Sequence, residues 1–106
     1  MERFVIAVYL PKPGKDRALL DLMREHIPLL RSEGLVTSRA PYVMRTQSGA
    51  IIEIFEWKSE KAVEAAHKNP ALQELWERFE AVCEWVNLDT LEECKQPFPH
   101  FEPVEL

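Results

Sequence analysis

The sequence predicts an α+β fold, and three observations support this fold class. Patterns typical of strands and helices follow one another in the order strand, helix, strand, strand, helix, strand. The first and third of these strands are apolar on both faces, which is typical of strands at the centre of a sheet. The chain has 106 residues, so residues 1–106 are expected to form one domain. Right-handed crossovers applied to this order predict a ferredoxin-like βαββαβ sandwich, with four antiparallel strands and two helices on one face.

The N-terminal part of the chain is predicted to form a strand followed by a helix. Residues 4–10 are apolar at every position, and the turn sequence Pro-Lys-Pro-Gly at residues 11–14 ends this strand. Apolar residues then recur at helical spacing from about Lys15 to Gly34, a residue suited to the left-handed conformation of a helix C-cap. Pro28 lacks a backbone N–H and clashes with the preceding turn, so we expect a kink in this helix.

A hairpin and a second helical region follow. Residues 41–46 and 50–57 have strand patterns and flank a short polar turn that ends in glycine, which predicts a β-hairpin. Ser59 is a suitable N-cap for a short helix, and the pair Asn69-Pro70 is typical of a second helix start. The apolar stripe continues without a break, so residues 82–86 are predicted as helix, although in isolation they have a strand pattern.

The C-terminal region is predicted to be mostly extended. A loop with a helical turn at residues 90–94 comes first. Residues 101–106 are expected to form the last strand of the sheet. Pro103 cannot donate a backbone hydrogen bond, so this strand is expected at an edge or at a bulge.

Two helices cover only one face of such a sheet, and this predicts an assembly. The strands at residues 4–10 and 50–57 would leave an apolar patch larger than the few hundred Å² or so that a monomer usually exposes. A second sheet packed on this face would cover it. We therefore expect a homodimer joined through the sheet faces, a dimeric α/β barrel, with residues 98–106 helping to seal the interface.

Charge and hydropathy exclude two classes of partner. The net charge of −5 makes nucleic acid an unsuitable ligand. No apolar run approaches the roughly 18 residues that a membrane span requires. Residues 4–10 resemble a short signal-peptide core, but Pro-Lys-Pro-Gly follows where a cleavage site should be, so we expect a cytoplasmic protein.

Several kinds of chemical site are also disfavoured. Cys83 and Cys94 lack metal-ligand spacing and are expected to be reduced and not catalytic. The three histidines are far apart in sequence, so no metal site is predicted. With three glycines in the chain, a glycine-rich phosphate loop is nearly excluded.

Short motifs in the chain are similar to those of a known family. These are Trp-Lys-Ser at residues 57–59, Ala-Ala-His at 65–67, Asn-Pro at 69–70, Pro-x-Pro-Gly at 11–14 and Phe-Glu-Pro-Val at 101–104. Together they resemble the antibiotic biosynthesis monooxygenase-like family of dimeric α/β barrels. The resemblance implies that barrel fold. It also implies, by analogy, a monooxygenase that needs no cofactor, because oxygenases of polycyclic substrates belong to the family beside haem-degrading enzymes and small proteins of unknown role.

Two histidines are candidates for the site. His26 lies on the apolar stripe of the first helix, where a polar group needs a partner or a function. It is the candidate general base, since imidazole suits proton abstraction near neutral pH; the alternative is a core histidine bonded to a backbone carbonyl. His67 lies late in the short helix and would either contact the ligand or cap the last carbonyls of that helix.

Two carboxylates in the central strand need partners if they are buried. The period of two places Glu53 and Glu56 on opposite faces of the sheet, so they are not a catalytic pair. Arg45 in the neighbouring strand is a candidate cross-strand partner for one of them. Glu53 or Arg45 would alternatively orient a ligand.

The aromatic residues suit a planar ligand. Trp57 and Trp76 are candidate ligand-binding residues, although an aromatic stripe at helical spacing is also typical of a core. Three functions therefore remain open. The chain is a cofactor-independent monooxygenase of a small aromatic or quinol-type substrate, a non-catalytic module that binds such a molecule, or a structural dimer whose interior is filled. For the first two we expect a cavity between helices and sheet, with His26 on its wall.

Overall fold

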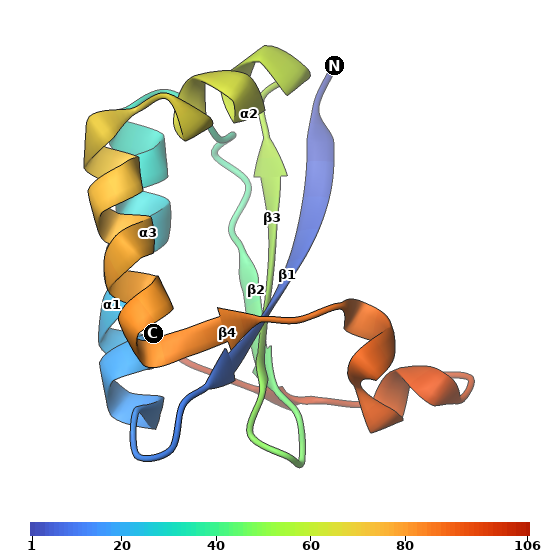
Figure 1. The fold of residues 1–106 in the computed structure, drawn as a ribbon. Coiled ribbons are helices and arrows are strands. Elements are labelled where there is room, and N and C mark those ends of the chain that lie inside the picture. The colour runs from blue at the N-terminus through green and yellow to red at the C-terminus, as the bar shows by residue number, and fades with distance from the viewer.

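A five-stranded antiparallel sheet with three α-helices on one face forms the structure of residues 1–106, a computed structural model that describes every residue (Figure 1). The strand order is β4-β1-β3-β2-β5. The predicted α+β class is confirmed, with one strand and one helix more than predicted, and the order of the first four strands is compatible with a ferredoxin-like βαββαβ unit. The elements are β1 (Arg3–Pro11), α1 (Asp16–Ser32), β2 (Tyr42–Arg45), β3 (Ile51–Trp57), α2 (Glu60–His67), α3 (Pro70–Val82), β4 (Cys83–Trp85) and β5 (Glu102–Pro103), with 3₁₀ helices η1 (Leu88–Thr90) and η2 (Glu92–Lys95).

The two long strands, β1 and β3, form the centre of the sheet. They pair in register from Arg3 opposite Trp57 to Tyr9 opposite Ile51. Every residue of β3 except Ile54 is buried. Because successive side chains alternate between faces, the odd-numbered residues of both strands point to the helical layer.

The helix ends follow the capping pattern of the sequence. The hydroxyl of Ser59 accepts from the backbone N–H of Ala62, and the side-chain oxygen of Asn69 accepts from that of Leu72, each at 3.1 Å. These bonds satisfy N–H groups that a helix start leaves free. Gly34 follows α1 with φ +70°, and α1 continues through Pro28, which lies on its exposed side. The predicted helix starts are confirmed.

The prediction of helix for residues 82–86 is wrong, because α3 ends at Val82 and β4 begins at Cys83. The backbone N–H of Val86 donates to the carbonyl of Val8 at 3.1 Å, and that of Lys12 donates to Val82 at 2.8 Å. These bonds join the segment to the edge of β1. β-Branched and aromatic residues fit either structure locally, so the strand partner decides which one forms.

The predicted position of the last strand is also wrong. The fourth strand of the βαββαβ unit is β4, whereas β5 is two residues long and lies at the opposite edge, beside β2. The N–H of Val104 donates to the carbonyl of Val43 at 2.9 Å. The edge position expected from Pro103 is confirmed.

The chain covers part of its own open sheet face. Leu91, between η1 and η2, packs on Val8 and Ile52 on the face that carries no α-helix. Other hydrophobic side chains of that face remain in solvent: Phe4 is 61% exposed and Ile6 48%. The open face is therefore only partly covered within one chain.

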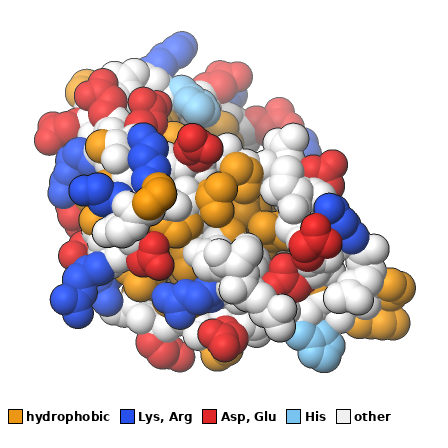
Figure 2. Space-filling model, turned by 60° about the horizontal axis from the view of Figure 1, so that its bottom comes forward, with side chains coloured by type: hydrophobic (Ala, Val, Ile, Leu, Met, Phe, Trp, Pro, Cys, Tyr) orange, Lys and Arg blue, Asp and Glu red, His pale blue; other side chains and the backbone are white.

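The surface mixes charges of both signs. Figure 2 shows acidic and basic side chains spread over one face, with a group of hydrophobic side chains near its centre. On this face the basic side chains do not merge into the continuous patch that binds a phosphate backbone. None of the helices combines the length and the apolar character needed to cross a bilayer.

The buried thiol of Cys83 is expected to make the stability of the protein fall at alkaline pH. Burial raises the pKa of its thiol from 9.0 to about 11. The charge of Lys12 lowers this pKa and that of Glu84 raises it, both by less than burial does. The unfolded chain therefore loses this proton at lower pH than the folded chain. The contribution of Cys83 to stability is complete below pH 9 and is lost as the pH rises toward 11. Chemical denaturation across this range should show a fall in stability that is smaller in Cys83→Ala.

Thiol labelling of the native protein provides a second measurement of the same property. Cys83 is 2% exposed, whereas Cys94 is partly exposed. A reagent at neutral pH should modify Cys94 first and Cys83 slowly, since a buried neutral thiol is a poor nucleophile. Equal rates at the two residues would contradict this prediction.

Candidate functional site

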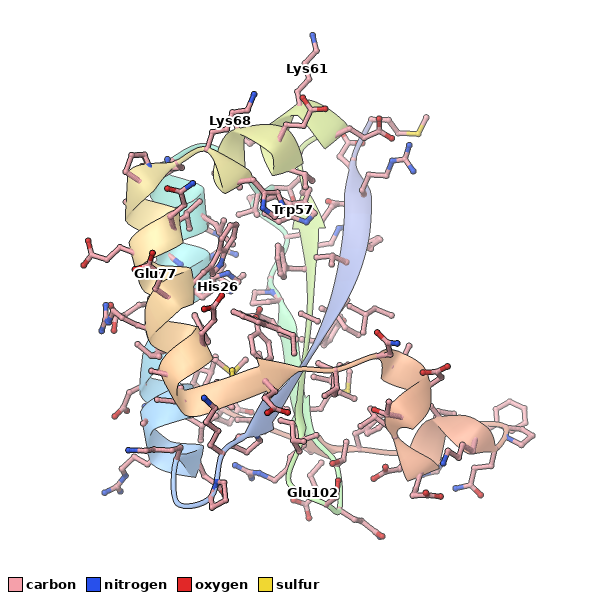
Figure 3. The ribbon with its side chains drawn as sticks, in the orientation of Figure 1. His26, Trp57, Lys61, Lys68, Glu77 and Glu102 are labelled. Atoms are coloured by element: carbon pink, nitrogen blue, oxygen red, sulfur yellow. The ribbon has the colours of Figure 1, made fainter.

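A cavity of about 410 Å³ lies between the helical layer and the sheet. Seven of its ten lining residues are hydrophobic. His26 reaches it from α1, and Trp57 lies at its upper end beneath α2 (Figure 3). The predicted cavity beside His26 is thus present, and its size and apolar walls are typical of sites for small molecules.

Six elements supply the cavity walls. The sheet contributes Val5, Ala7, Tyr9, Phe55 and Trp57, which are alternate residues of β1 and β3. The other lining residues are His26 of α1, His67 of α2, Trp76 and Glu80 of α3, and Trp85 of β4. The aromatic side chains thus come from both the sheet and the helical layer, so a planar molecule in the cavity would contact aromatic rings on two sides.

A chain of hydrogen bonds links four side chains beside this cavity. The hydroxyl of Tyr9 donates to Oε1 of Glu53 at 2.7 Å. Nδ1 of His26 lies 3.0 Å from the same oxygen, and the indole Nε1 of Trp76 donates to Nε2 of His26 at 3.1 Å. The four residues come from β1, β3, α1 and α3, so the network forms only in the folded chain.

The partners of His26 assign its tautomer. An indole N–H is a donor only, so Nε2 of His26 must be an acceptor. The imidazole proton is therefore on Nδ1, from which it is donated to Glu53. His26 is neutral in this arrangement, and a carboxylate holds its ring orientation, as in other histidine general bases.

Glu53 is a buried carboxyl group with incomplete pairing. Its side chain is fully buried, Oε1 accepts two hydrogen bonds, and Oε2 has no partner. Burial of an unpaired polar atom lowers stability. Local sacrifices of this kind are more frequent at functional sites than in ordinary cores.

Tyr9 is held in its neutral form. Burial raises the pKa of its hydroxyl well above the ordinary value of 10.0, and the negative charge and hydrogen bond of Glu53 raise it further. Tyr9 therefore stays a donor at neutral pH and does not itself act as a base. Its role is to hold Glu53.

The structure brings five of the six predicted site residues together. Glu53, His26 and Trp76 share the hydrogen-bonded chain, and Trp57 and His67 line the cavity. The ring of His67 packs on that of Trp76, 5.3 Å between centroids. The backbone N–H groups of Lys68 and Asn69 donate to the carbonyls of Ala65 and Ala66, and the side-chain amide of Gln73 donates to the carbonyl of His67. Of the two alternatives predicted for His67, the capping role is therefore wrong, and the position on the cavity wall is the one that the structure shows.

Arg45 does not pair with either carboxylate, and that prediction is wrong. The register places Val43 opposite Glu53 and Arg45 opposite Ile51. Glu56 instead accepts from the hydroxyl of Thr37 at 2.9 Å and from Nε of Arg39 at 3.2 Å. The hydrogen bond from Thr37, and to a lesser extent the hydrogen bond and charge of Arg39, hold the pKa of Glu56 below its ordinary value. Burial opposes this effect.

Sequence reasoning did not assign Tyr9 to the site. Its signal was a hydroxyl in a strand that is otherwise apolar, since a buried hydroxyl needs an acceptor. Glu53 is that acceptor. The register of β1 on β3 places Ala7 opposite Glu53, and Tyr9, two residues after Ala7, points to the same face of the sheet.

The chain matches no model of a known protein family, and no curated protein matches it. No group of three or more His, Cys, Asp or Glu side chains is arranged to hold a metal ion. Function is therefore inferred from the geometry of the cavity.

Proposed function

We propose that the cavity binds a small planar aromatic compound with a hydroxyl group, of phenol or quinol type, and that His26 removes the hydroxyl proton for a cofactor-independent oxygenation. One observation carries this proposal. A neutral imidazole, oriented by a buried carboxylate, lies on the wall of a cavity lined by aromatic rings. That is the arrangement required of a general base for an aromatic acid.

The proposed reaction needs only the substrate and molecular oxygen. Nε2 of His26 takes the hydroxyl proton, and the anion delocalises its charge onto a ring carbon. That carbon donates an electron pair to O₂, a C–O bond forms, and the peroxide takes the proton back from His26. Loss of the ring C–H proton together with cleavage of the O–O bond releases water and leaves a new carbonyl. A phenol plus O₂ thus becomes a quinone plus water, so the substrate supplies all the electrons.

Each residue of the hydrogen-bonded chain has a role in this scheme. Glu53 keeps the Nδ1 proton of His26 in place and stabilises the imidazolium that forms at Nε2. Tyr9 holds the carboxylate of Glu53. Trp57 and the neighbouring rings would stack on the planar substrate.

A second candidate function is binding without catalysis, and one observation favours it. Nε2 of His26 already accepts a hydrogen bond from Trp76, so its lone pair is in use in the ligand-free chain. A filled structural interior is disfavoured, because the cavity is open.

Oxygen uptake in the presence of hydroxynaphthalenes and hydroquinones tests the proposal. We expect uptake above the rate of spontaneous oxidation, with one carbonyl product and no peroxide released. Calorimetric binding without uptake would support the non-catalytic alternative. The absence of both binding and oxygen uptake would overturn both candidate functions.

We also propose that two copies pair through the open sheet face, with residues 98–106 contributing to the interface. Ile6, Ile54 and Tyr42 form a row across three strands of that face, and Tyr42 is 72% exposed. A stable dimer that buries about 2,000 Å² or more would cover this row. A cytoplasmic location is also proposed, where the two cysteines, which form no disulfide with each other, would stay reduced.

The Ile6→Asp variant tests this assembly. A charge buried between two sheets is strongly unfavourable, so sedimentation at micromolar concentration should change from dimer to monomer. Ala65→Asp, which places the same charge on the exposed side of α2, is the control and should remain dimeric. A wild-type protein that sediments as a monomer would contradict the proposal.

A further inference from the structure

We infer that the indole N–H of Trp76 is a hydrogen-bond donor to His26 that a ligand can displace, and that it marks the position of the ligand's hydroxyl group. The site would then select planar aromatic compounds with a hydroxyl at the ring edge against compounds of the same shape that lack the donor. This inference rests on the proposed function, because it concerns the same cavity and the same nitrogen of His26.

The hydrogen bonds of His26 leave room for one donor at a time. A neutral imidazole has one acceptor lone pair, and its other nitrogen is bonded to Glu53. Trp76 uses that lone pair, with Nε1 3.1 Å from Nε2 and the two ring planes at 62°. A ligand hydroxyl therefore reaches the base only when the indole N–H leaves it.

The surroundings of Trp76 allow it to leave. Trp76 is partly buried, whereas His26 and Phe79, the rings of which pack against each other, are buried. The ring of Trp76 also contacts that of His67, an exposed residue at the end of α2. A rotation toward His67 would place the indole N–H where water can solvate it.

The exchange is close to balanced, and it depends on the ligand having a donor. A hydroxyl that replaces the indole restores the bond to Nε2, and hydroxyl donors form shorter bonds than N–H donors. A methyl ether of the same ring system has no proton to offer. It would leave His26 without a donor if it displaced Trp76, and buried polar groups left unpaired produce strong selectivity.

Nuclear magnetic resonance of the ¹⁵N-labelled protein tests the displacement directly, with 2-naphthol and 2-methoxynaphthalene as probes. In the free protein the Trp76 indole N–H, assigned from its loss in Trp76→Phe, should exchange slowly with water. Saturating 2-naphthol should shift this signal and accelerate its exchange, and the ether should do neither. A bound 2-naphthol that leaves the indole signal and its exchange unchanged would overturn the inference.

Calorimetry on matched variants provides the second readout. Trp76→Phe keeps an aromatic ring but removes the competing donor, so 2-naphthol should bind about fivefold more tightly, the value of one neutral hydrogen bond, and the ether should not. Trp57→Phe alters the cavity wall without touching His26, and should weaken both probes alike. Equal losses of affinity for both probes in Trp76→Phe would overturn the inference, because Trp76 would then act only as part of the cavity wall.

The outcomes separate the two proposals. Displacement of the indole by 2-naphthol without oxygen uptake would keep the inference and reject the oxygenation. Uptake that depends on His26, with the indole signal unchanged in the complex, would keep the oxygenation and reject the inference. Failure of 2-naphthol to bind both wild type and Trp76→Phe would overturn the inference.

Discussion

Replacement of His26 by Gln is expected to lower kcat for the proposed oxygenation by about 100- to 10,000-fold, the usual contribution of a general base. An amide at this position can still donate an N–H to Glu53 and so keeps the buried carboxylate paired. It has no basic nitrogen to receive the substrate proton. Oxygen uptake at saturating substrate measures the effect, with thermal unfolding as the check that the variant is folded.

The neighbouring histidine provides the control for this variant. His67 also lines the cavity, but it is bonded to no carboxylate, and its ring contacts Trp76. His67→Gln should change kcat by less than about tenfold, because this residue takes no part in the proton transfer. If His26→Gln kept the wild-type rate, His26 would not be the base.

Replacement of Tyr9 by Phe is expected to lower the free energy of unfolding by about 1.5–3 kcal/mol, the range for hydrogen bonds to charged groups. The substitution removes one hydroxyl and leaves the shape of the ring. Glu53, which is fully buried, would keep a single donor, His26. Urea denaturation at neutral pH, where the raised pKa of Tyr9 keeps the hydroxyl protonated, is the measurement.

Tyr42→Phe is the matched control for that change. Both substitutions are compared in the monomeric Ile6→Asp background, where no second copy would cover the open sheet face. Tyr42 is 72% exposed on that face in the single chain, so loss of its hydroxyl should there alter stability by no more than about 0.5 kcal/mol in either direction. Similar effects of the two substitutions would show that the Tyr9 hydroxyl contributes no net stability. Glu53 would then be held by His26 alone.

The parts of the fold that local chemistry determines were predictable from the sequence. Ser59 and Asn69 cap the helices that follow them, because their side chains reach backbone N–H groups three residues away. The period of two also placed Glu53 and Glu56 on opposite faces of β3. The position of His26 on an apolar stripe indicated a polar residue beside the cavity.

The parts that depend on distant partners were not predictable. The segment at residues 83–85 has no local preference that separates strand from helix, and its pairing with β1, more than 70 residues earlier in the chain, decides its structure. The pairing of Arg45 with Glu53 or Glu56 was mispredicted for the same reason. A shift of two residues in the register of β2 on β3 decides whether Arg45 or Val43 faces Glu53, and the hairpin sequence does not specify that register.

The shortness of β4 has a consequence for how fast the cavity exchanges its contents. β4 pairs with β1 only from Tyr9 to Pro11, so the earlier part of β1, whose Val5 and Ala7 line the cavity, has no strand on that side. In Figure 1, β4 crosses the lower part of β1, and no strand runs beside the upper part of β1 on that side. Because the cavity is open to solvent, a small molecule can arrive without the opening of a lid, at a rate set by diffusion and orientation. Residence time, and not access, would then control occupancy.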